Sequence, residues 1–181
     1  MGIPENSRSR RPVVAATWGL AAVAAYAVAG VLQILVWNPL AAVPGATLGE
    51  IRADMARAQE PLAASWVVGW AGIGLLLAAL VLLVTVVRRT IRVNLVVAMY
   101  LVLVVFAAPG HIFVAFGPGM SLADTFMISG GDHAPWGGVL YLFSAAALVT
   151  LIVLIIRTSR AAAADLAEAY ARAEGESGPE A

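Results

Sequence analysis

The stretch LLLAALVLLVTVVRRTIRVNLVVAMYLVLVV, residues 75–105, decides the fold of this chain. It consists of two apolar runs joined by a short link that carries Arg88, Arg89 and Arg92. A helix needs about 20 consecutive apolar residues to cross the hydrocarbon core of a bilayer, at a rise of about 1.5 Å per residue. Extended outward, each run reaches that length without a charged residue. The stretch therefore predicts two membrane-spanning helices joined by a basic turn.

The whole chain contains four such runs, and none of them includes Lys, Arg, Asp or Glu: Val13–Trp37, Leu62–Val87, Val93–Phe116 and Trp136–Ile156. The composition agrees, because 61% of the 181 residues are hydrophobic and only 12% are charged, far from the values of soluble domains. The first run is about twice as long as the apolar part of a signal peptide, so we interpret it as a retained helix. We expect an all-α membrane protein with four transmembrane helices.

Arginines mark the span ends that we expect in the cytoplasm. They cluster before the first span, between the second and third, and after the fourth: Arg8, Arg10, Arg11, Arg88, Arg89, Arg92, Arg157 and Arg160. Tryptophans gather at the opposite ends, where their rings suit the headgroup layer: Trp37, Trp66, Trp70 and Trp136. Every basic residue is arginine and alanine is abundant, which is typical of a GC-rich bacterial genome. We therefore predict a multi-pass protein of a bacterial plasma (inner) membrane with both termini in the cytoplasm.

An internal duplication is suggested by two related motifs. PGATLGE at 44–50 and PGMSLAD at 118–124 align at a shift of 74 positions, which also places Pro61 on Pro135. A Thr or Ser followed three residues later by an acidic residue is a capping box that begins a helix. We expect two tandem helical hairpins, at about 13–88 and 89–160, each with a short amphipathic outer helix. An even number of spans per half predicts a parallel repeat about an axis along the membrane normal.

The domain organisation follows from these boundaries. Residues 1–12 form a cytoplasmic N-terminal segment and residues 13–160 form the four-helix membrane domain. Residues 161–181 form a cytoplasmic tail, helical at first because Ala, Leu, Glu and Arg favour helices, and disordered in its polar end.

Three residues of the outer loops are candidates for a metal site: His111, Asp132 and His133. Nitrogen and oxygen ligands of this kind suit Zn²⁺ or another divalent cation. Their spacing fits no compact metal motif, and Asp132 has the alternative role of stabilising the N-terminus of the fourth helix. The shift of 74 places His111 on Trp37, at the outer interface. With no cysteine, the chain has no thiolate ligand or thiol nucleophile.

The functional hypotheses follow from how few polar groups the spans contain. Without ionisable residues deep in the membrane, a monomeric ion-coupled transporter is disfavoured, and Gln33 and Ser144 are expected to hydrogen-bond between helices. We hypothesise a non-catalytic subunit or accessory protein that contacts the lipid bilayer and a membrane-protein partner or a second copy, and no nucleic acid. One alternative is a small-solute transporter or channel formed by oligomerisation, with a cavity lined by Gln33, Asn94 and Tyr100. The other is an outward-facing metal-dependent membrane enzyme.

Overall fold

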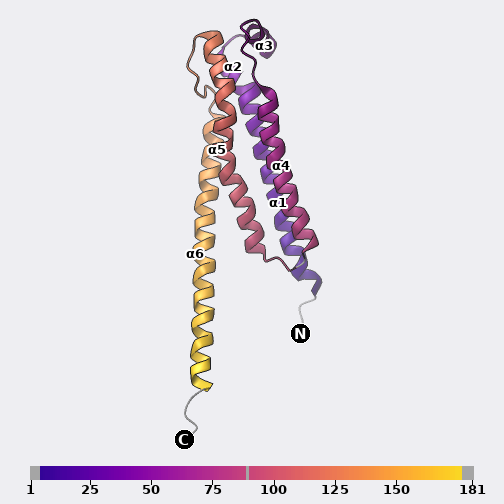
Figure 1. Ribbon diagram of the computed structural model, residues 1–181, viewed down its shortest axis with the longest axis vertical. Helices are drawn as coiled ribbons and strands as arrows, with labels where there is room; N and C mark the ends of the chain where they lie inside the picture. The colour runs from indigo at the N-terminus through magenta and orange to yellow at the C-terminus, as the bar shows by residue number, and fades with distance from the viewer. Residues whose placement is uncertain (1–4, 89, 177–181) are drawn as a thin grey trace.

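The computed structural model describes residues 5–88 and 90–176, which contain helices and no strand. The elements in chain order are α1 (Glu5–Leu32), the π-helical segment η1 (Gln33–Trp37), α2 (Asn38–Ala42), α3 (Leu48–Arg57), α4 (Ala64–Val87), α5 (Val93–Phe126) and α6 (Trp136–Glu176) (Figure 1). Four helical stretches are long and apolar enough to cross a membrane: Arg10–Ala42, Ala64–Val87, Val93–Phe126 and Trp136–Arg172. The predicted all-α class is confirmed, and so are four helices long and apolar enough to span a membrane.

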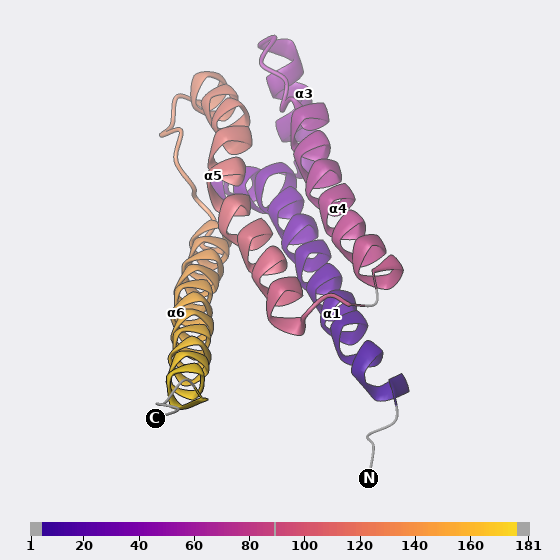
Figure 2. The same cartoon turned by 60° about the horizontal axis from the view of Figure 1, so that its bottom comes forward.

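The helices do not pack as a symmetric square. Helix α1 packs along α4 and α5, and α5 packs along α4 and α6, whereas α6 touches α1 much less. Figures 1 and 2 show α6 diverging from α1 toward the end at which α1 begins and α6 ends. We call this the inner end, and the end that carries α2 and α3 the outer end. Helices α1 and α5 are therefore the central pair, and α6 is attached mainly through α5.

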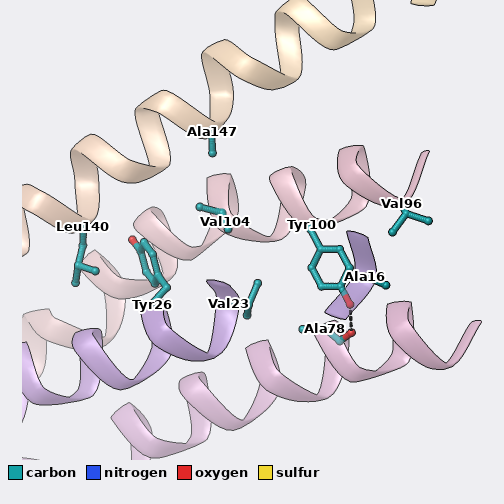
Figure 3. Close-up of a cluster of buried hydrophobic side chains, with 9 residues drawn as sticks. All are labelled: Ala16, Val23, Tyr26, Ala78, Val96, Tyr100, Val104, Leu140 and Ala147. Carbon is teal, nitrogen blue, oxygen red and sulfur yellow. Dashed lines mark hydrogen bonds between the residues drawn. The ribbon is translucent and has the colours of Figure 1, made fainter. Parts of the chain in front are cut away.

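The core of the bundle lies between α1, α4 and α5, and Leu140 and Ala147 of α6 complete it (Figure 3). The Tyr100 hydroxyl of α5 donates a hydrogen bond of 2.8 Å to the Ala78 carbonyl of α4. The ring of Tyr100 covers Gly19 of α1, where a Cβ atom would collide with it. In a bilayer, close packing and hydrogen bonds between helices replace the hydrophobic driving force that acts in water. Glycine at position 19 is thus required by the approach of α1 to α5.

Helix α3 covers the outer end of the bundle. Its predicted capping box is confirmed: the Thr47 N–H donates to the Glu50 carboxylate at 2.8 Å, and the Glu50 N–H donates to the Thr47 hydroxyl at 3.3 Å. The predicted apolar face is also confirmed, because Ile51 and Met55 are buried in one cluster with Leu122 of α5.

The second outer helix was predicted wrongly. Pro118 and Gly119 do not form a turn but lie inside α5, which continues to Phe126, ten residues beyond the predicted end of the span at Phe116. The extended part packs closely on the loop that follows α5, because a Cβ on Gly119 would come within 2.7 Å of the Gly130 carbonyl oxygen. The prediction that the third span continues through Pro109 is confirmed. The tandem hairpins and their duplication stay predictions.

The chain ends differ from their predicted boundaries. Helix α1 begins at Glu5, within the predicted N-terminal segment, and α6 continues beyond Ile156 to Glu176. The helical first part of the tail is confirmed. Residues 177–181, predicted to be disordered, lie outside the described residues.

Candidate functional site: a buried polar cluster at the outer end

The π-helical segment η1 positions two side chains, Gln33 and Asn38, that hydrogen-bond to the loop between α5 and α6. We call this set of contacts the clasp. A π-helix bonds residue i to residue i+5, and here the Asn38 N–H donates to the Gln33 carbonyl. The wide turn therefore places Gln33 and Asn38 close together on the helix. Gln33 Nε2 donates to the Ala134 carbonyl at 3.2 Å. Asn38 Oδ1 accepts from the His133 N–H at 2.6 Å and from the Ala134 N–H at 3.3 Å. Two buried amides thus hold the loop down.

His111 lies below this clasp and is fully buried, with no exposed surface. Its Nδ1 is 3.2 Å from the Tyr141 hydroxyl of α6. The Trp70 ring of α4 meets the imidazole edge to face, with 5.7 Å between ring centroids. Space for the indole comes from two glycines, because a Cβ on Gly30 or Gly110 would come within 2.8 Å or 2.6 Å of it. All four long helices therefore meet around one histidine.

A second group of hydroxyls extends the cluster inward. The Ser144 hydroxyl lies 2.9 Å from the Val104 carbonyl and 3.1 Å from the Tyr26 hydroxyl. Because Ser144 has one proton to donate, the carbonyl takes that proton and Tyr26 donates to Ser144 Oγ. These bonds join α1, α5 and α6, so the expected interhelical role of Ser144 is confirmed. Gln33 instead bonds to the loop before α6.

Asp132 lies at the outer surface, above His111. Its carboxylate rests on the first turn of α6, where a Cβ on Gly137 would collide with it and would come 3.2 Å from Gln33 Nε2. Gly137 and Tyr141 are four residues apart and share a helix face. A negative charge at a helix N-terminus is also favourable, which fits the alternative role expected for Asp132.

Two polar atoms of the cluster have no hydrogen-bond partner. Among the described residues, Gln33 Oε1 and His111 Nε2 are the buried side-chain nitrogen or oxygen atoms left unpaired. Leaving such an atom unpaired costs about 1–3 kcal/mol. Sequence reasoning expected Gln33 to hydrogen-bond between helices but gave Tyr141 no role. The glycines at 30 and 110 were the available signal, because only their lack of a side chain admits Trp70 beside the histidine.

The predicted metal ligands do not converge. His111 Nδ1 is 3.2 Å from the Tyr141 hydroxyl, and the Asp132 carboxylate rests on Gly137 of α6. The exposed His133 Nε2 is 3.0 Å from the Ser129 carbonyl oxygen of its own loop. Within residues 5–88 and 90–176, no group of three or more His, Cys, Asp or Glu side chains is placed to hold a metal ion. The structure thus gives these three residues no shared metal-ligand geometry.

His111 also lies further inside than the duplication predicted. It packs beside Gly30, seven residues or about two helical turns before Trp37. The prediction that no ionisable side chain is buried among the spans is wrong, because His111 is fully buried where α1, α4, α5 and α6 meet. The position of His111 relative to the membrane interface stays a prediction.

The cavity predicted for a transport function is not formed in this chain. Gln33 lies in the outer clasp, Tyr100 is bonded to α4, and Asn94 is exposed on the first turn of α5. The hollows between the long helices, which lie below α3, are apolar. One, of about 190 Å³, lies between α1, α4 and α5 beside Trp70, and another, of about 220 Å³, lies between α1, α5 and α6.

Comparisons with protein-family models, with curated proteins and with solved structures find no match to this chain. Its function therefore has to be argued from its own geometry.

Proposed function

We propose that this protein is a non-catalytic subunit or accessory protein of a bacterial plasma membrane, with both termini in the cytoplasm, that binds another membrane protein. The observation that carries the proposal is the inner half of α6. Its outer half is anchored by Leu140, Ser144 and Ala147, which are buried. From Leu148 to Arg172 no side chain of the helix is buried, although the helix continues without a break. A long helix held at one end alone offers a surface to a partner.

A cleft accompanies this free helix. The hollow of about 220 Å³ between α1, α5 and α6, here called the inner cleft, opens where α6 diverges from α1. Its α1 wall consists of small residues: Ala15, Gly19 and Ala22. Small residues let a second helix approach closely in a bilayer. The cleft therefore suits a transmembrane helix of a partner, or α6 of a second copy.

The polar groups of the spans favour a packing role over transport. Tyr100, Tyr26 and Ser144 bond to groups of the same chain. The cavities beside them are apolar, so they provide no continuous polar path. The described contacts give no support for transport through a single copy. A pore between copies would need a polar lining, and the lining of the inner cleft is apolar.

The experiment is purification of the chain in a mild detergent, with a photo-crosslinking residue at Leu151, which is half-buried, or at Leu142, which faces outward. We expect one defined adduct from position 151 and none from position 142. Ala22→Leu fills the inner cleft and is expected to abolish the adduct from position 151. Ala21→Leu, on the exposed side of α1, should leave that adduct intact. A lone monomer without an adduct from either position would contradict the proposal.

A further inference from the structure

A shallow groove lies between α4 and α5 in the inner half of the bundle. It has a volume of about 420 Å³ and is lined by apolar side chains. Leu77 and Val81 belong to its α4 wall, and Leu95, Met99 and Val102 belong to its α5 wall. This α4–α5 groove shares no lining residue with the inner cleft, so a ligand bound in it is independent of the proposed function.

Two arginines continue the walls of the groove at its inner end, where α4 is linked to α5 (Figures 1 and 2). Arg88 lies seven residues, or about two helical turns, after Val81, and its N–H still donates to the Val84 carbonyl at 2.8 Å. Arg92 lies three residues before Leu95, whose N–H donates to the Arg92 carbonyl at 3.0 Å. Residues three, four and seven apart share a helix face. Each arginine is therefore in register with the helix face that lines the groove.

The inner end of the groove is positively charged and open. Both arginine side chains are exposed, and neither pairs with an acidic side chain that the structure describes. Those acidic side chains lie at the outer end or on the inner half of α6: Glu50, Asp54, Glu60, Asp124, Asp132, Asp165 and Glu168. A guanidinium is a planar fork that matches two phosphate oxygens, and its long stem can lie along an apolar surface. This end of the groove thus suits a phosphate group.

The walls of the groove suit an acyl chain better than a helix. A transmembrane helix approaches closely where small residues line its path. The inner cleft has such a wall, whereas Ala98 is the one small residue among the leucines, valines and methionine of the α4–α5 groove. Basic pockets between transmembrane helices bind anionic lipid headgroups. We propose that the α4–α5 groove binds one anionic phospholipid, with an acyl chain in the groove and the phosphate group on Arg88 and Arg92.

The test compares two lipids with the same acyl chains: phosphatidylglycerol, which is anionic, and phosphatidylcholine, which has no net charge. Native mass spectrometry of the full-length protein in mild detergent counts the lipids bound at each lipid concentration and so gives Kd. An arginine near an anionic headgroup contributes about fivefold in affinity, so two arginines predict a preference of about 25-fold for phosphatidylglycerol. The double variant Arg88→Gln with Arg92→Gln should abolish that preference.

Matched variants separate the groove from general charge and size. Arg157→Gln with Arg160→Gln removes the same charge from exposed positions of α6 and should keep the preference. Ala98→Leu fills the groove and should weaken the binding of both lipids, whereas Ala79→Leu, exposed on α4 outside the groove, should not.

Three results would overturn the proposal. Equal affinities for the two lipids would show that any acyl chain fills the groove. Equal loss of preference in the two arginine pairs would show an effect of overall charge. Unchanged lipid binding in Ala98→Leu would leave the groove to another occupant, such as a helix of a partner.

Discussion

The clasp between η1 and the loop before α6 can be tested by replacing Asn38 with alanine. Asn38 is 6% exposed, and its Oδ1 accepts the N–H groups of His133 and Ala134. His133 is exposed, so its N–H regains a bond to water. Ala134 is buried, so its N–H is left unpaired. We expect Asn38→Ala to lower the free energy of unfolding by about 1–3 kcal/mol, the cost of one buried unpaired donor.

The assay is a denaturant titration in mixed micelles followed by tryptophan fluorescence, because the Trp37 and Trp136 rings are 5.6 Å apart beside the clasp. Hydrogen exchange at the Ala134 amide provides a local measurement and should accelerate in the variant. Asn94→Ala is the control, since Asn94 is exposed at the start of α5 and should change the stability by less than about 0.5 kcal/mol. The reasoning fails if both variants have equal stability and the Ala134 amide exchanges as in the wild type.

Two further predictions concern a close helix contact and a helix cap. Gly19→Ala should destabilise the bundle by about 1–3 kcal/mol because the new methyl group overlaps the Tyr100 ring. Gly72→Ala places its methyl group in open space and should not destabilise the bundle. Equal unfolding midpoints for the two variants would refute the contact. Hydrogen bonds from the Thr47 backbone and then its side chain hold the pKa of Glu50 below its usual value. This carboxylate therefore stabilises α3 above its unfolded-state pKa, and the contribution is lost as the pH falls through the folded-state pKa. The protection factors of the amides in the first turn of α3 should fall on acidification in the wild type and stay constant in Glu50→Gln.

The parts of the fold that were predictable depend on local patterns. Four uncharged apolar runs are long enough to cross a bilayer whatever surrounds them, so the spans were readable from the sequence. The cap of α3 was readable for the same reason, since Thr47 and Glu50 satisfy each other within one turn. Such features require no knowledge of the partner helix.

The candidate site was not predictable, because it depends on contacts between distant segments. Gln33 and Ala134 are 101 residues apart, and His111 and Tyr141 are 30 apart. The π-helical turn that aligns Gln33 with Asn38 has no sequence signal that we recognised. The sequence did place His111 and Asp132 among the candidates, but as metal ligands.

The two Pro-Gly motifs explain why similar sequences fold differently in the two halves. Pro44 and Gly45 form a turn, and Gly45 has φ of 88°, a conformation that favours glycine. Pro118 and Gly119 are helical, and the Gly130 carbonyl of the loop that follows α5 packs against Gly119 and leaves no space for a side chain. The same motif thus meets a different tertiary contact in each half. That loop is the segment held by Gln33 and Asn38, so the clasp, the length of α5 and the burial of His111 form one connected arrangement.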